Sequence, residues 1–299
     1  MGTDLELRVI GSDVELLDQA LVDAEKELRR VEDLMTDWRP SPLETLNDAA
    51  GQGPQVVEKE LFLLIQRGVR IGELTGGAFD ITYAGAGQLW DFKADPPKLP
   101  SDVEIEAALA RVGYAKLVLD EAALTVDLPA GMRIGLGGIA KGYGVDRAMA
   151  LFMKRGIENA IVNAGGDLKA LGRKFDKVWE IAIRHPRDRE RVLAMLPVSN
   201  VCVVTSGDYE RFFELGGKRY HHILDPRTGR PSTGCMSATV TAPDAAFADA
   251  LATAVCVLGP EKGLELIEAL DRVEALVVGM DGAVTLSTGL AGPAKTSGE

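Results

Sequence analysis

Two oxygen-bearing side chains, Asp249 and Thr253, interrupt an apolar stretch in the last fifth of the sequence. Because they are four residues apart, they share one face if this stretch is helical. Buried polar side chains need partners, and Mg²⁺ prefers carboxylate, hydroxyl and carbonyl oxygens. The pair is therefore a candidate magnesium site. The alternative is that Asp249 is simply favoured by the dipole near the start of its helix.

A second candidate is the glycine-rich segment 135–144, which contains five glycines and Lys141. Glycines leave backbone amides unshielded, and a helix N-terminus beside a lysine suits a phosphate group. The spacing is neither that of a P-loop nor that of a dinucleotide-binding fingerprint, which would need glycine where Ala140 stands. The segment therefore predicts an anion site without a common nucleotide motif.

Three further segments combine glycine, hydroxyl and acidic residues. Segment 76–82 begins with two glycines, which indicate either a helix C-cap or a place where a flat ligand approaches the backbone. Segment 204–208 is a strand that runs into a polar turn, and alone it is typical of an Asx or Ser/Thr turn. Segment 220–229 contains two adjacent histidines. In a strand they point to opposite faces, so at most one can act as a base at a given site.

Composition limits the classes of function. The 299 residues carry 33 basic and 45 acidic side chains, a net charge of −12, which argues against nucleic-acid partners and anionic membranes. The three cysteines lack C-x-x-C spacing, so neither a disulfide framework nor a zinc site is expected. No apolar run approaches the length of a transmembrane segment.

The elements that must position these segments mix helices and strands without a regular βαβ repeat, which favours an α+β fold with mainly antiparallel sheets. Apolar residues recur at three- and four-residue steps over 14–34 and predict an amphipathic helix, capped by a Ser12–Glu15 box. We expect residues 290–299 to form a flexible tail. Further helices are predicted over 58–74, 101–113, from the glycine-rich segment to about 155, 244–257 and 260–270, and strands over 5–10, 116–119, 124–128, 160–162, 178–184, 199–204, 219–224, 236–241, 274–279 and 283–286.

Taken in order, these segments resemble the ApbE family, the FAD:protein FMN transferases. The match runs from residue 1 to about residue 259, and the resemblance implies one catalytic domain over 1–299, built from two tightly packed, T-fold-like halves. The strings that carry it are MTDW at 35–38, GAFDIT at 77–82, GGIAKGY at 137–143, NAGGD at 163–167, TSGD at 205–208, HILDPRTG at 222–229 and DALAT at 249–253.

The resemblance implies an enzyme that uses Mg²⁺, cleaves FAD and attaches FMN by a phosphoester bond to a Thr or Ser hydroxyl of a target protein, with release of AMP. The implied acceptors are subunits of sodium-pumping NADH:quinone reductases, Rnf-type complexes or other extracytoplasmic redox proteins. Two alternatives stay open, a FAD pyrophosphatase and a flavin-binding protein without turnover. Relatives are commonly periplasmic lipoproteins, whereas this sequence shows no signal peptide, so a trimmed leader is compatible with it and the compartment stays open.

By the same resemblance, Asp249, Thr253 and the backbone carbonyl of Gly138 would bind the metal, and His222 would assist the transfer. Two positions depart from the family pattern. Gly135 stands where many relatives carry Asp, and the loop after Trp38 lacks the usual Ser-Glu-like pair, so we expect different metal affinity or recognition there. The implied cofactor-binding residues are Met35, Ala78, Phe79, Asp80, Lys141, Gly165, Gly166, Thr205, Ser206, Gly207, Asp208 and Ile223.

Overall fold

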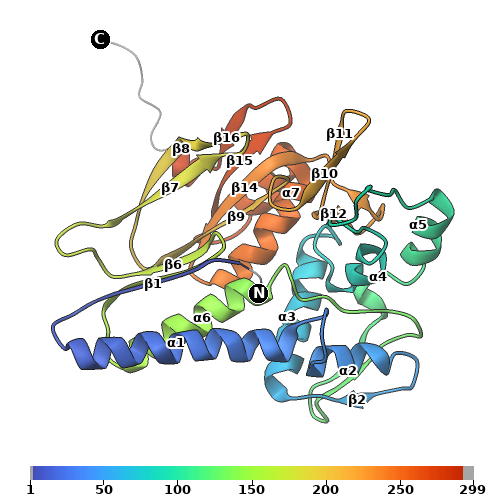
Figure 1. Cartoon of the computed structure of the whole chain (residues 1–299), viewed down its shortest axis with the longest axis horizontal. Coiled ribbons are helices and arrows are strands. Elements are labelled where there is room, and N and C mark those ends of the chain that lie inside the picture. Colours follow the sequence, from blue (N-terminus) through green and yellow to red (C-terminus); the bar gives the residue numbers. More distant parts are fainter. Residues whose placement is uncertain (1–2, 292–299) are drawn as a thin grey trace.

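A seven-stranded sheet forms the centre of the computed structural model, which describes residues 3–291 (Figure 1). The strands follow the order β1-β5-β6-β9-β14-β15-β16, and every neighbouring pair is antiparallel. The predicted mixture of helices with antiparallel sheet is confirmed. The strands are β1 (Leu5–Ile10), β5 (Asn159–Ala164), β6 (Asp167–Leu171), β9 (Val201–Gly207), β14 (Cys235–Ala242), β15 (Glu274–Gly279) and β16 (Val284–Leu286).

The two faces of this sheet are covered by different elements. Successive side chains of a strand point to opposite faces, so Val162 of β5 joins the main core while the adjacent Ile161 packs on the other side. That other side is covered by the hairpin of β7 (Trp179–His185) and β8 (Asp188–Val198), whose Trp179 is buried there. The sequence predicted β7 but not β8.

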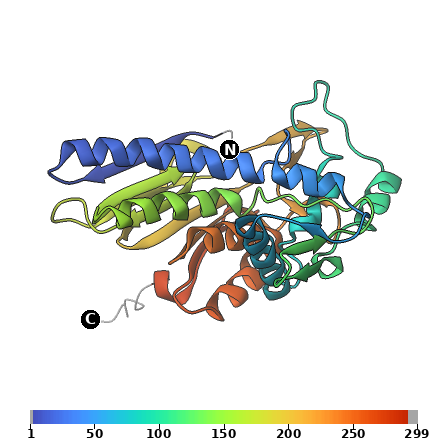
Figure 2. The same ribbon diagram turned by 90° about the horizontal axis from the view of Figure 1, so that it is seen from below.

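Three long helices cover the main-core face: α1 (Val14–Met35), α6 (Ala140–Lys154) and α7 (Ala245–Glu268). Figure 2 shows α1 in blue beside α6 in green. The predicted Ser12–Glu15 box is wrong, because Asp13 is the N-cap and accepts the amide of Leu16 at 3.1 Å. The predicted break between two C-terminal helices is confirmed, since α7 turns at Gly259 (φ 80°) before Pro260.

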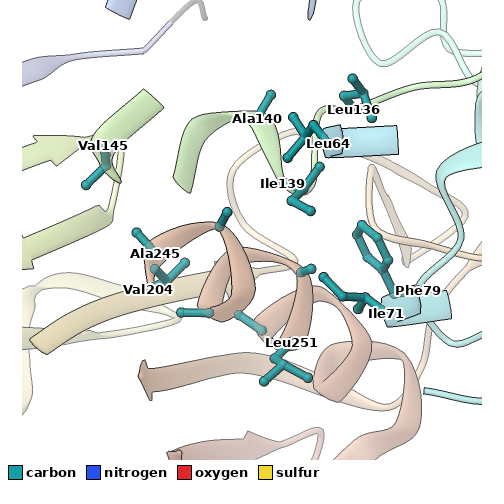
Figure 3. Close-up of a cluster of buried hydrophobic side chains, with 14 of the residues drawn as sticks. Leu64, Ile71, Phe79, Leu136, Ile139, Ala140, Val145, Val204, Ala245 and Leu251 are labelled. Atoms are coloured by element: carbon teal, nitrogen blue, oxygen red, sulfur yellow. The ribbon is translucent and has the colours of Figure 1, made fainter. Parts of the chain in front are cut away.

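Residues 42–127 form a smaller group of elements around a three-stranded sheet of order β2-β4-β3. Its core is continuous with that of the long helices, and Figure 3 shows Ile71 and Phe79 in one cluster with Leu251 of α7. The elements are α2 (Pro42–Asp48), β2 (Gln55–Val56), α3 (Lys59–Leu74), η1 (Ile81–Tyr83), α4 (Ala84–Gly87), α5 (Asp102–Leu109), η2 (Tyr114–Lys116), β3 (Val118–Asp120) and β4 (Thr125–Asp127).

Two short hairpins carry the histidine segment: β10 (Phe212–Leu215) with β11 (Lys218–His221), and β12 (Leu224–Asp225) with β13 (Arg230–Pro231). They are held against residues 84–100 by a cluster of stacked and tilted rings and by a 2.9 Å bond from the Trp90 indole N–H to a backbone carbonyl. The rings belong to Trp90, Phe92, Phe213 and Tyr220.

The described chain ends at α8 (Thr288–Ala291). The predicted tail over 290–299 therefore falls mostly outside the described residues. Among residues 3–291, none of the helices combines the length and the apolar character needed to cross a bilayer.

Candidate active site

A cavity of about 340 Å³ opens where the end of α1, the turn after α3, the start of α6, the end of β9, the segment after β11 and the middle of α7 meet. Segments that are far apart in the sequence thus converge as the sequence analysis expects. Of the predicted site residues, only Gly166 and Asp208 do not line it. The predicted residues that do are Met35, Ala78, Phe79, Asp80, Gly138, Lys141, Gly165, Thr205, Ser206, Gly207, His222, Ile223, Asp249 and Thr253.

Lys141 and Asp249 line this cavity, and Lys141 also contacts the buried Asp167, which lies outside the lining. The Lys141 ammonium lies 3.0 Å from Asp167 Oδ2 and 3.1 Å from Asp249 Oδ1, and both aspartates are 1% exposed. Burial and the neighbouring Asp249 raise the pKa of Asp167 well above its usual range. Although burial opposes it, the two carboxylates raise the pKa of Lys141. A cation bound beside these two acids would favour the ionised form of Asp167, whose burial next to Asp249 otherwise opposes it.

A close crossing of α6 and α7 positions these groups. The backbone N–H of Gly142 donates to Asp249 Oδ2 at 3.2 Å. A Cβ at Gly142 would lie only 2.2 Å from the carbonyl oxygen of Ala245, so this position requires glycine. Asp146 of α6 accepts the amides of Ala245 and Ala246 at 2.8 and 3.0 Å, which fixes the first turn of α7. Packing and a side-chain cap therefore set the place of Asp249.

The predicted metal ligands present a set of oxygen donors. Asp249 and Thr253 lie on one face of α7 and both reach the cavity. The Thr253 hydroxyl has only a long, 3.4 Å contact with Ser206, and it lies 3.5 Å from the place of a Cβ on Gly138. Within residues 3–291, no three His, Cys, Asp or Glu side chains converge as metal ligands. A carboxylate, a hydroxyl and a nearby carbonyl are hard donors that fit a small divalent cation.

Of the two adjacent histidines, one faces the cavity as expected, but the predicted strand over 219–224 is wrong in its middle, because β11 ends at His221 and β12 begins at Leu224. His222 lines the cavity, while His221 is buried elsewhere with Nε2 2.9 Å from the Ser232 carbonyl. Burial, reinforced by nearby positive charge, lowers the pKa of His222 to about 4. The imidazole is therefore neutral at pH 7 and able to accept a proton. Its buried Nδ1 has no hydrogen-bond partner among the described residues.

The turn after α3 ends the helix and leads into the cavity wall, while the approach of a flat ligand to segment 76–82 stays a prediction. Gly76 and Gly77 have φ of 58° and 79° and end the helix, which confirms the C-cap. The Asp80 carboxylate accepts the Thr82 amide and hydroxyl at 2.8 and 2.7 Å and the Tyr114 amide at 2.8 Å. Its hydrogen bonds hold this turn in the conformation that places Ala78 and Phe79 in the cavity wall.

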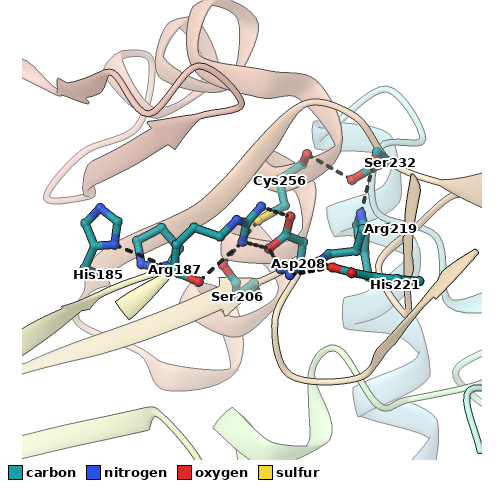
Figure 4. Close-up of polar contacts among 10 residues, drawn as sticks. His185, Arg187, Ser206, Asp208, Arg219, His221, Ser232 and Cys256 are labelled. Carbon is teal, nitrogen blue, oxygen red and sulfur yellow. Dashed lines mark hydrogen bonds and ion pairs between the residues drawn. The ribbon is translucent and has the colours of Figure 1, made fainter. Parts of the chain in front are cut away.

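Asp208 and Gly166 have supporting positions outside the cavity lining. Asp208 is 2% exposed and binds the Arg187 guanidinium through contacts of 2.5 and 2.6 Å, with Arg219 at 3.7 Å (Figure 4). Gly166 has φ of 96° and donates to Asn163 Oδ1 in the turn after β5. Their predicted contact with a cofactor stays a prediction, and the structure gives both a role in holding cavity-lining neighbours.

A glycine also brings the start of the described chain to the cavity. Gly165 adopts φ of 62°, and its amide donates to the Asp4 carbonyl at 3.0 Å. A Cβ at this glycine would lie 1.9 Å from the Thr3 hydroxyl oxygen, and Thr3 itself lines the cavity. Thr3, which precedes β1, is thus part of the cavity wall.

Several lining residues were missed as site residues. Asp37 and Trp38 follow Met35 in a quoted string, and Arg211 follows the 204–208 turn, so position in the chain was the available signal. Burial raises the pKa of Asp37 and raises that of Tyr83 to about 12. Asp37 Oδ2 lies 3.1 Å from the place of a Cβ on Gly135, so a carboxylate already occupies the space beside this unusual glycine.

Comparisons with known proteins agree with this geometry. The sequence profile of the ApbE family matches residues 1–277. The chain is 37% identical to the FAD:protein FMN transferase of Treponema pallidum, over 84% of this chain and 74% of that protein. It is 33% identical to one from Klebsiella pneumoniae, over 96% and 90%.

Solved structures give the same result. The crystal structure of the ApbE protein from Thermotoga maritima superposes with a TM-score of 0.89 at 35% identity, over 97% of this chain and 95% of that one. The flavin transferase ApbE from Vibrio cholerae gives 0.86 at 30% identity, over 97% and 96%.

Proposed function

The chain belongs to the ApbE family, and we propose that it is a magnesium-dependent FAD:protein FMN transferase. The observation that carries the proposal is the convergence of three kinds of group on one cavity. These are a set of hard oxygen donors at Asp249 and Thr253, the buried cation Lys141 and the neutral His222. Relatives with the same fold are named for this reaction.

The proposed binding mode assigns each wall of the cavity a role. Met35, Phe79 and Ile223 offer apolar surface to the flavin, and the end of β9 supplies hydroxyls and backbone beside it. Asp249, Thr253 and the Gly138 carbonyl would hold Mg²⁺, which when bound neutralises the charge of the pyrophosphate. Lys141 adds a permanent positive charge beside the same ligand, since the carboxylates around it keep it protonated.

The proposed chemistry uses His222 as a base. A Thr or Ser hydroxyl of the acceptor protein attacks the phosphorus of the FMN half of FAD. The new phosphoester bond forms as the bond to the AMP oxygen breaks, so AMP leaves as an anion. His222 takes the hydroxyl proton, which its neutral state at pH 7 allows. The acceptors implied by the resemblance, subunits of sodium-pumping NADH:quinone reductases or Rnf-type complexes, stay predictions.

The test is incubation of the chain with FAD, Mg²⁺ and a Thr-containing acceptor domain, followed by intact mass and AMP measurement. We expect the acceptor to gain one FMN moiety, with one AMP released, and no gain when its Thr is replaced by Ala. Asp249→Asn and His222→Ala should abolish the gain. Glu261→Gln, on the exposed side of the same α7, is the matched control and should leave it unchanged.

The outcome distinguishes three classes of protein. AMP release at the same rate with and without acceptor would make the chain a FAD pyrophosphatase instead. Tight FAD binding with no AMP under any condition would make it a flavin-binding protein without turnover. Activity of Asp249→Asn at the wild-type level would overturn the metal-dependent mechanism.

A further inference from the structure

Arg211 stands at the mouth of the cavity, in the short connection between β9 and β10. Its side chain is exposed, and over residues 3–291 its guanidinium makes no hydrogen bond or ion pair. Two arginines nearby differ in this respect, since Arg187 pairs with Asp208 and Arg219 pairs with Glu214. An unpaired guanidinium beside paired neighbours is available to bind a ligand.

The backbone places Arg211 next to the proposed base. Its carbonyl accepts the backbone N–H of His222 at 3.0 Å, which ties the two residues together across the hairpin. Burial is the main influence on the pKa values of His222, Asp37 and Tyr83, and the positive charge of Arg211 adds a lowering effect on each. Arg211 thus lines the same cavity as these three groups.

The distribution of positive charge in the cavity is uneven. Among the described residues, its lining contains two cations, Lys141 and Arg211. Lys141 is already bound to two buried carboxylates, whereas Arg211 is free. A pyrophosphate held at the oxygen donors of α7 would share this cavity with His222 and Arg211. A planar guanidinium suits such oxygens because its N–H groups match phosphate in pairs.

We propose that Arg211 binds a non-bridging oxygen of the phosphoryl group that is transferred, on the side of His222. The proposal rests on the proposed function. In the transition state of phosphoryl transfer, negative charge spreads over the equatorial oxygens. Arg211 stabilises this charge on the oxygen that it binds. The phosphoester bond to the acceptor hydroxyl forms, the bond to AMP breaks and the hydroxyl proton moves to His222. No proton moves at Arg211, whose charge is permanent.

The test compares ligands that differ in phosphate. Binding of riboflavin, FMN and FAD, each with Mg²⁺, is measured by calorimetry for the wild type, Arg211→Gln and Arg211→Lys. We expect Arg211→Gln to weaken FMN and FAD binding roughly 10- to 100-fold and to leave riboflavin unchanged. Arg211→Lys should bind FMN and FAD more tightly than Arg211→Gln, because lysine keeps the positive charge but lacks the paired N–H groups of the guanidinium. Arg70→Gln, an exposed arginine of α3 outside the cavity, is the control.

Each contrary result has a defined meaning. Unchanged FMN and FAD affinity in Arg211→Gln, or an equal loss for riboflavin, overturns the proposal. A higher KM for the acceptor protein with unchanged flavin affinity assigns Arg211 to the acceptor instead and also overturns it. A wild type that binds FAD through Arg211 but transfers no FMN contradicts the proposed function alone, and one that binds no phosphorylated flavin contradicts both.

Discussion

The buried neutral imidazole of His222 makes a quantitative prediction about stability and pH. Its pKa is about 4 in the folded chain, against 6.5 for an exposed histidine. Between these values the unfolded chain binds a proton that the folded chain does not. The free energy of unfolding therefore falls as the pH drops from 6.5 to 4, and the decrease due to His222 is complete well below pH 4.

The magnitude follows from the difference between these two pKa values, which corresponds to about 3 kcal/mol well below pH 4. Only part of this stabilisation is lost in a pH range that is practical for measurement. Between pH 7 and pH 5, the same linkage gives a loss of about 2 kcal/mol from His222 alone. A variant without a titrating side chain at this position lacks that loss.

The assay is urea unfolding of the wild type and His222→Gln, followed by tryptophan fluorescence at pH 8, 7 and 5. The difference in unfolding free energy between the two proteins should stay constant between pH 8 and pH 7. It should then shift by about 2 kcal/mol in favour of the variant at pH 5. If the two proteins lose the same free energy between pH 7 and pH 5, the buried neutral state of His222 is refuted.

Three other substitutions test the supports of the site. Lys141→Met should lower metal-free stability by about 3 kcal/mol, because it removes the ammonium that the buried Asp167 and Asp249 share. Mg²⁺ should then raise the Tm of the variant more than that of the wild type, and equal shifts would contradict a cation site there. Arg187→Gln should cost about 2 kcal/mol in urea unfolding, since Asp208 stays buried, and an unchanged midpoint would contradict this. Gly142→Ala should lower Tm and FAD affinity together, because the added Cβ pushes α7 away from α6. The control Gly85→Ala, which has open space at its Cβ, should change neither. Wild-type FAD affinity in Gly142→Ala would show that the helix crossing does not position Asp249.

Local patterns predicted the elements well where one rule dominated. The apolar periodicity over 14–34 and the Gly259-Pro260 break both correspond to helix ends in the structure. The N-cap of α1 was misplaced by one residue, because Ser12 and Asp13 are both good caps and only the backbone decides between them. Strand β8 was missed because its charged start and its proline hide the pattern of a strand that pairs only with β7.

The site shows a clearer division between local and tertiary information. The spacing of Asp249 and Thr253 alone predicted a shared face, and the structure shows that both residues line a cavity. Nothing local linked Lys141 to two carboxylates 26 and 108 positions later in the chain, so the sequence suggested a phosphate rather than Asp167 as its partner. Arg211 was missed for the same reason, since its importance comes from a free guanidinium at a mouth formed by distant segments.

The packing of Thr3 against Gly165 has a practical consequence for handling this protein. Thr3 lies in the wall of the cavity, so the N-terminal end of the described chain is close to the proposed flavin site. A purification tag at that end would compete for space with the flavin or with the acceptor protein. A tag placed after α8, which contributes no residue to the cavity lining, leaves the entrance open and is the sound choice for every assay described above.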